Sequence, residues 1–130
     1  MSSIFSYSNR DFKFILKEWL PIEEIFAYPK FSDYYSKDDL DMLLDQVLKM
    51  AVEVVAPTAD VCEEFGVKFE EGKVTVAPVF RELFKYIQEN GWGTSNIDET
   101  AEGIMPEVVL MSIMEMIQAA NPAQLSSVGL

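Results

Sequence analysis

Carboxylates are the side chains best able to carry chemistry in this sequence, because it has no histidine and a single cysteine, Cys62. The absence of imidazole excludes Ser-His-Asp and Cys-His nucleophile systems and HExxH zinc sites. One cysteine cannot form an internal disulfide or a CxxC redox site. Cys62 lies at an apolar helical offset without a basic neighbour, which predicts a small core side chain rather than a reactive thiolate.

Two groups of carboxylates could suggest a metal or acid–base site. Asp38, Asp39 and Asp41 form an acidic run, but Leu43 stands where an EF-hand loop beginning at Asp38 needs Gly. Negative charge at a helix N-terminus explains this run better. Four glutamates flank a predicted hairpin: Glu63, Glu64, Glu70 and Glu71. Nothing near them marks a pocket, so a solvated acidic face is expected rather than acid–base catalysis.

The composition predicts one domain with a buried core, because 49% of the 130 residues are hydrophobic. Ten basic and 22 acidic residues give a net charge of −12, which argues against nucleic acid or an anionic membrane as a partner. The longest apolar run, 108–111, is far shorter than the roughly 20 residues that span a bilayer. The start of the sequence does not look like a secretory signal, so we expect a cytoplasmic protein.

The elements that position these residues are mostly helical. A helix over 10–20 is predicted because its apolar side chains share one face and Pro21 follows them. Pro21 can begin a short second helix over 22–26. Ser36 is a suitable N-cap for a third helix. The apolar residues of this helix recur at three- and four-residue spacing until Pro57 ends or kinks it.

A two-stranded hairpin is predicted between Val67 and Val76, where apolar and polar residues alternate on either side of Gly72. Because an isolated hairpin is marginally stable in water, we expect it to lean on the helices. Pro78 then precedes a fourth helix, and Asn90 with the following glycine predicts its end.

The fifth helix, from Pro106 to about Ala120, is apolar over most of its circumference. Only Ser112, Glu115 and Gln118 form a narrow polar stripe. Such a helix is either the middle member of a small bundle or part of a surface that other domains cover. Periodicity alone favours neither alternative.

Together these elements predict an all-α fold, a small bundle of about five helices with one short β-hairpin. Large apolar side chains from the predicted helices are expected to form the core: Phe12, Leu16, Trp19, Leu43, Leu44, Val47, Phe80, Phe84, Ile113 and Ile117.

The order of several short sequences resembles that of a known family. A helix with Arg10-Asp-Phe-Lys-Phe-Ile-Leu16 precedes a long helix ending in Val54-Val-Ala-Pro57, and the hairpin follows. Then come Asn90-Gly-Trp92, a loop closing in Met105-Pro106, and a helix running into Ala119-Ala-Asn-Pro122. This order, over nearly the whole chain, resembles the N-terminal helical domain of acyl-CoA dehydrogenases. It looks closest to the subgroup that includes 3-methylmercaptopropionyl-CoA dehydrogenases.

The resemblance implies a role within a larger enzyme. Complete members of the family oxidise an acyl thioester to the 2,3-enoyl thioester, with a carboxylate base, FAD as hydride acceptor and an electron-transfer flavoprotein as electron acceptor. Their flavin-binding segment and catalytic Glu lie beyond the N-terminal domain. The chain is therefore expected to be a piece of such an enzyme that binds no FAD and has no activity alone.

The resemblance also divides the chain into an N-terminal helical extension, 1–36, and the family's helical domain, 37–130. It implies acyl-CoA and the enzyme's middle and C-terminal domains as partners. Residues after the fifth helix would line the acyl-chain pocket: Ala123, Gln124, Leu125 and Val128. Small and apolar side chains suit a hydrocarbon, with the Gln124 amide as a polar limit.

Two departures from the family pattern keep an alternative open. The loop 101–106 retains only Gly103 and Pro106 of the usual Gly-Gly-x-Gly-x-Pro, and Met114-Glu115 replaces a common Glu-Glu pair. The alternative is a stand-alone acidic helical domain that binds a protein partner without catalysis. If other domains normally cover the fifth helix, we expect the isolated chain either to self-associate through the region 111–128 or to have mobile last residues.

Overall fold

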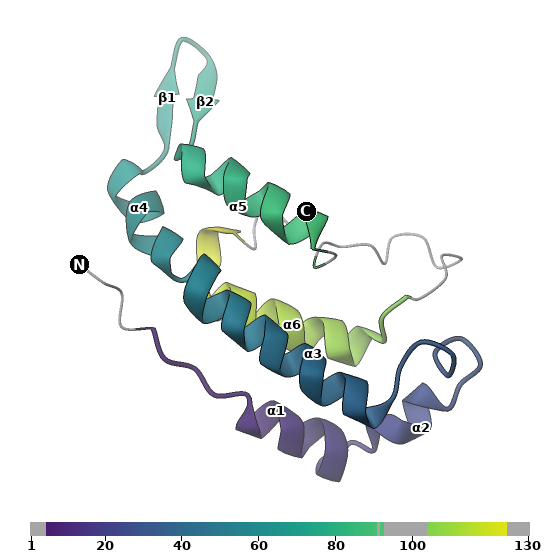
Figure 1. Cartoon of the computed structure of the whole chain (residues 1–130). Coiled ribbons are helices and arrows are strands. Elements are labelled where there is room, and N and C mark those ends of the chain that lie inside the picture. Colours follow the sequence, from purple (N-terminus) through teal and green to yellow (C-terminus); the bar gives the residue numbers. More distant parts are fainter. Residues whose placement is uncertain (1–4, 91, 93–103, 125–130) are drawn as a thin grey trace.

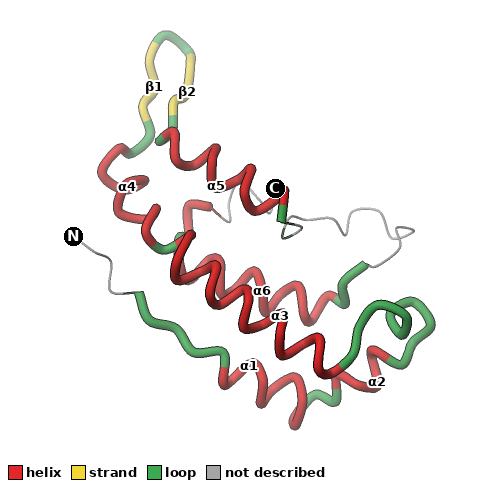
Figure 2. The backbone as a smooth tube through the Cα atoms, in the orientation of Figure 1, coloured by secondary structure: helices red, strands yellow, loops and turns green. Residues whose placement is uncertain are grey.

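The computed structural model describes residues 5–90, 92 and 104–124. It shows a helical bundle from which a single hairpin projects (Figures 1 and 2). Helices α3 (Lys37–Met50) and α6 (Glu107–Ala120) pack against each other at its centre. The prediction of an all-α fold with one hairpin is confirmed.

The N-terminal helices run along one side of α3. Helix α1 (Arg10–Phe14) continues into a π-helical turn (Ile15–Trp19), and α2 (Ile22–Phe26) begins after Pro21. These bounds agree with the predicted helices. Three apolar side chains of this segment are buried in the common core: Leu16, Ile22 and Phe26. The proposed division at residue 36 remains a prediction.

Helix α3 begins with a capping box. The Asp39 amide donates to Ser36 Oγ at 3.3 Å, and the Ser36 amide donates to Asp39 Oδ2 at 3.0 Å. The acidic run therefore serves the helix N-terminus. A π-helical turn (Ala51–Val55) joins α3 to α4 (Pro57–Phe65). Pro57 occupies the first turn of α4, where its missing N–H costs no helical hydrogen bond.

The hairpin consists of β1 (Lys68–Glu70) and β2 (Lys73–Thr75). Glu71 and Gly72 between them have φ values of 51° and 77°, and positive φ at both turn residues matches the right-handed twist of the strands. The expectation that the hairpin leans on the helices is wrong, because all six strand residues are exposed. It projects beyond the ends of α4 and α5 (Pro78–Glu89) (Figure 1).

Helix α6 is the central helix of the bundle. Seven of its side chains are buried: Val109, Ser112, Ile113, Met114, Met116, Ile117 and Ala120. Of its large apolar side chains, Met111 is the one that stays mainly exposed, at 53%. The structure thus supports the bundle alternative for most of this helix, because α3 and the second π-helical turn already cover it.

The expected core is correct in part. Leu16, Leu44, Val47, Ile113 and Ile117 are buried. Phe12, Leu43 and Phe84 are partly buried and pack against the cluster, and Phe80 has intermediate exposure. Trp19 was expected in the core and is 70% exposed. It lies at the end of the first π-helical turn, whose wider winding rotates side chains away from the face that a 3.6-residue period predicts.

Candidate functional site

The residues expected to line an acyl-chain pocket begin where α6 ends. Asn121 is extended, with φ −152° and ψ 98°, and residues 122–124 then form a new helical turn. Within this turn Ala123 is exposed and Gln124 is fully buried. Leu125 and Val128 lie outside the described residues. The two described members of the predicted set therefore occupy opposite faces of one turn.

Asn121 is the junction of this region and is itself only 2% exposed. Its Oδ1 accepts the Ala123 amide at 3.2 Å, and its backbone carbonyl accepts the Gln124 amide at 3.1 Å. Its Nδ2 donates to Thr58 Oγ1 of α4 at 2.9 Å. Asn121 thus caps the new turn and ties it to a helix 63 residues away in sequence.

Thr58 continues the hydrogen-bond chain into the bundle. Its hydroxyl donates to the Val55 carbonyl at 2.6 Å, at the end of the second π-helical turn. Cys62 Sγ lies 3.8 Å from Asn121 Nδ2, one helical turn beyond Thr58. The prediction that Cys62 is a core side chain is confirmed only in part, because this side chain is half-buried. The arrangement supplies hydrogen bonds that fix a backbone and no activated nucleophile.

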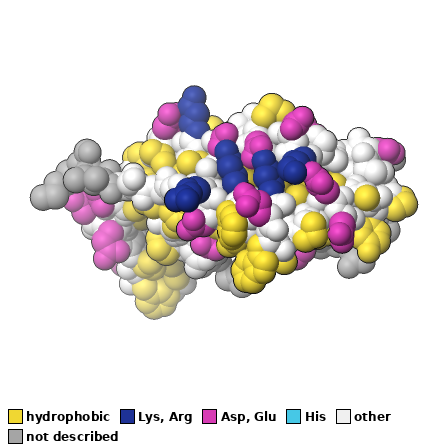
Figure 3. All heavy atoms as spheres, turned by 90° about the horizontal axis from the view of Figure 1, so that it is seen from below, with side chains coloured by type: hydrophobic (Ala, Val, Ile, Leu, Met, Phe, Trp, Pro, Cys, Tyr) yellow, Lys and Arg dark blue, Asp and Glu magenta, His cyan; other side chains and the backbone are white. Residues whose placement is uncertain are grey.

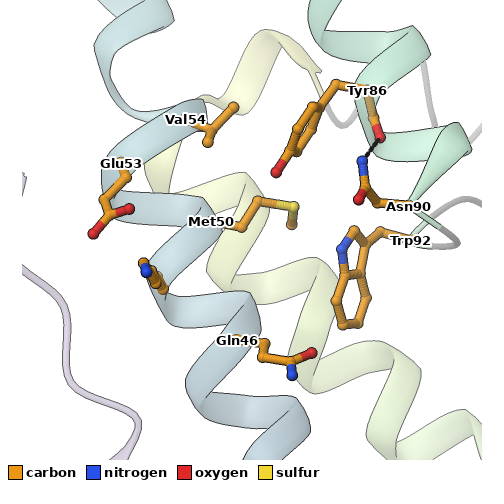
Figure 4. A pocket seen from close by; sticks show the side chains of 8 residues that line it. Gln46, Met50, Glu53, Val54, Tyr86, Asn90 and Trp92 are labelled. Carbon is orange, nitrogen blue, oxygen red and sulfur yellow. Dashed lines mark hydrogen bonds between the residues drawn. The ribbon is translucent and has the colours of Figure 1, made fainter.

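A hollow of about 360 Å³ lies between α3 and α5. Tyr86 and Trp92 face Met50 and Val54 across it (Figure 4). Gln46, Lys49 and Glu53 also line it. Asn90 donates to the Tyr86 carbonyl at 2.8 Å at its edge. Half of the residues that line this hollow are polar or charged, so it lacks the predominantly apolar lining of a typical ligand pocket.

The N-terminal segment is held to the bundle by charged and polar contacts. Asp45 of α3 accepts hydrogen bonds at 2.7 Å from both Lys13 and Asn9, while Lys17 pairs with Asp41. The bond from Lys13, and then that from Asn9, lowers the pKa of Asp45 below its usual value. Figure 3 shows Lys and Arg side chains gathered among carboxylates on this side of the molecule.

Glu115, at the position where the family commonly has a Glu-Glu pair, contacts the N-terminal segment. The Tyr7 hydroxyl donates to Glu115 Oε1 at 3.0 Å. Burial, and then this hydrogen bond, raises the pKa of the Tyr7 phenol above its usual value. Glu115 is therefore engaged in holding the segment against α6.

The glutamates considered for acid–base work are all exposed: Glu63, Glu64, Glu70 and Glu71. In the described part of the chain, no three carboxylates or thiols come together as a metal site would require. In the same residues, no helix is long and apolar enough to cross a membrane.

Sequence reasoning missed the pairing of Thr58 with Asn121. The Asn-Pro step follows the end of the fifth helix, α6, at Ala120. The same step is also the signature of an N-cap followed by proline at the first helical position. Its partner on α4 carries no sequence signal, because only tertiary packing brings the two residues together.

Two curated relatives match the chain. Both are named butyryl-CoA dehydrogenase, from Syntrophomonas wolfei subsp. wolfei (strain DSM 2245B / Goettingen), and they are 36% and 35% identical over 120 residues, or 90% of this chain. The chain spans about a fifth of the length of each relative, 20%. No family model matches the chain, and no solved structure matches it significantly. The similarity to proteins of this name extends over nine-tenths of the chain.

Proposed function

We propose that this chain is the N-terminal helical domain of an FAD-dependent acyl-CoA dehydrogenase-like protein that oxidises an acyl thioester to the 2,3-enoyl thioester. The observation that carries the proposal is the 36% identity over 120 residues to a protein named butyryl-CoA dehydrogenase. In this role the domain contributes to the acyl-chain pocket, and the remaining domains of the enzyme are its partners. We place it in the subgroup that includes 3-methylmercaptopropionyl-CoA dehydrogenases.

The end of α6 is suited to this contribution. Ala123 is exposed on a turn whose other face is buried, so a small apolar side chain is presented by a fixed backbone. A hydrocarbon needs such a wall and needs no hydrogen-bond donor from it. Leu125 and Val128 would extend the wall, and acyl-CoA would be the ligand.

FAD, which the family uses as hydride acceptor, does not fit the described residues. A flavin pyrophosphate needs donors and positive charge without competing carboxylates. Three hollows of the described chain each combine cations with acids, as Arg81 with Glu82, and Lys49 with Glu53. The third places Arg10, Lys13 and Lys17 beside Asp11 and Glu18. We therefore assign flavin binding to other parts of the complete enzyme.

The test is to express the complete polypeptide that the gene encodes and to follow reduction of an artificial dye by acyl-CoA substrates. We expect turnover with butyryl-CoA or 3-methylmercaptopropionyl-CoA, and the ratio of the two rates tests the subgroup. The chain 1–130, supplied with FAD, should give only the rate of the control without protein. A gene product that ends at Leu130, or a longer one without turnover, would contradict the proposal and favour the interaction domain.

A further inference from the structure

We propose that Thr58 and Asn121 are positioning residues that set the place of Ala123, and through it the acyl-chain length that the complete enzyme accepts. This inference rests on the proposed function, because it assigns Ala123 to the substrate pocket. Its structural half, the control of the turn after α6 by a residue of α4, can be tested on the chain itself.

The first step of the argument is the burial of the hydrogen-bonded groups. Asn121 is 2% exposed, Thr58 9% and Gln124 0%. A buried amide must find partners inside the protein, because leaving it unpaired is costly. Asn121 can meet this demand in one orientation, with Oδ1 toward the Ala123 amide and Nδ2 toward Thr58 Oγ1. The position of Thr58 therefore fixes the orientation of the cap.

The second step is the anchoring of Thr58. Its only hydroxyl proton goes to the Val55 carbonyl, so its oxygen is left as an acceptor for Asn121. The acceptor stands at the join between the π-helical turn and α4, in the packed part of the bundle. The position of the turn after α6 is thus set by a contact with the bundle as well as by α6 itself.

The third step concerns what this placement controls. Ala123 and Pro122 are exposed while Asn121 and Gln124 on either side are buried. A shift of the cap would move Ala123, together with the contact between Asn121 Nδ2 and Cys62 Sγ. In a pocket for a hydrocarbon, such a shift changes the length or width available and leaves the chemistry untouched.

The structural arm of the experiment uses amide hydrogen exchange by NMR on the chain 1–130. Thr58→Val keeps the shape of the side chain but removes the acceptor for Asn121. We expect the Ala123 amide to exchange about tenfold faster, as loss of one buried hydrogen bond would cause. Thr58→Ser should restore the slow exchange. Ser112→Ala is the matched control, because the buried Ser112 hydroxyl bonds only to the Val108 carbonyl of its own helix.

The kinetic arm uses the complete polypeptide and a series of saturated acyl-CoA substrates. For Thr58→Val we expect the ratio of kcat/KM between the longest and shortest accepted chains to change about tenfold. The change should lie in KM more than in kcat, and Thr58→Ser should return it to the wild-type value. Ser112→Ala should leave the profile unchanged. If Thr58→Val does not fold, Thr58→Ala removes the same acceptor in a smaller side chain.

The outcomes separate the two proposals. A wild-type polypeptide without activity on any acyl-CoA overturns the proposed function and, with it, the link to chain length. An active wild type whose Thr58 variant keeps the same chain-length profile overturns this inference alone. An unchanged Ala123 exchange rate in folded Thr58→Val overturns its structural half, whatever the enzyme does.

Discussion

The N-terminal segment, residues 5–26, and the β-hairpin of β1 and β2 differ in how they meet the bundle and in what they leave exposed. The segment is bonded to α3, whereas the hairpin connects α4 and α5 and projects beyond their ends (Figure 1). The segment buries Leu16 and Ile22 to 1% exposure and satisfies Asp45 with two hydrogen bonds. The hairpin instead leaves Phe69 and Val74, which are directly paired across the strands, 71% and 60% exposed.

The difference is that buried apolar side chains anchor the segment, whereas every strand residue of the hairpin is exposed. The segment buries Leu16, Ile22 and Phe26 in the core but leaves three other large apolar side chains exposed: Phe14 at 52%, Trp19 at 70% and Leu20 at 43%. The hairpin presents a cross-strand apolar pair, with Val67 also 72% exposed on the same face. Exposed apolar side chains on a hairpin are unfavourable in water and promote contact with another apolar surface. We therefore expect substitutions in the segment and in the hairpin to have different effects on stability and on self-association.

The largest expected effect is on stability. Leu16→Ala should lower the free energy of unfolding by about 2–5 kcal/mol, because it removes a buried side chain and leaves a cavity. Phe69→Ala in the hairpin should change it by less than about 0.5 kcal/mol, although the deleted side chain is larger. Urea unfolding followed by circular dichroism measures both. A greater loss for Phe69→Ala would show that the hairpin packs against the bundle.

A smaller effect is expected on self-association, which was predicted for the fifth helix. Helix α6 exposes Met111 to 53%, whereas the hairpin exposes three large apolar side chains. We therefore expect light scattering across a concentration series to show a fall in apparent mass for Phe69→Glu that exceeds the fall for Met111→Glu. Met116 is not a surface position, so a charge there would test folding instead. A larger effect of Met111→Glu would indicate that the chain self-associates through α6.

The smallest expected effect depends on pH. The lowered pKa of Asp45 means that its charged form stabilises the folded chain above the unfolded pKa, near about 4, and that this stability disappears as the pH falls through the folded value. Asp45→Asn should cost about 0.5 kcal/mol at pH 7, because the pair is largely exposed, and nothing at pH 2. Equal costs at both pH values would mean that packing, not charge, holds the segment.

Much of the bundle follows from local patterns in the sequence. Ser36 and Asp39 cap α3, and Gly72 turns the hairpin, through interactions between residues that are close in sequence. The prediction that Trp19 lies in the core is wrong because a π-helical turn changes the helical period. No residue type in the sequence indicates such a turn. The expectation that the hairpin leans on the helices is wrong because its contacts depend on where α4 and α5 end, which local sequence patterns do not determine.

The sequence predicted which residues follow α6 at the candidate site, but not how they are arranged. The resemblance gave Ala123 and Gln124 by position, but their opposite exposure depends on how the turn after α6 meets the bundle. The bond from Asn121 to Thr58 joins residues 63 positions apart, beyond the reach of periodicity. A sequence pattern can identify a cap, and tertiary packing decides to what that cap is tied.

The central claim, that this chain is a domain of an acyl-CoA dehydrogenase-like enzyme, is tested most directly by the flavin itself. The complete polypeptide, purified and held without oxygen, should carry the absorbance of bound flavin. We predict that butyryl-CoA or 3-methylmercaptopropionyl-CoA bleaches this absorbance, while the chain 1–130 shows no flavin to bleach. A complete polypeptide that binds no flavin, or whose flavin stays oxidised with every acyl-CoA, would contradict the account.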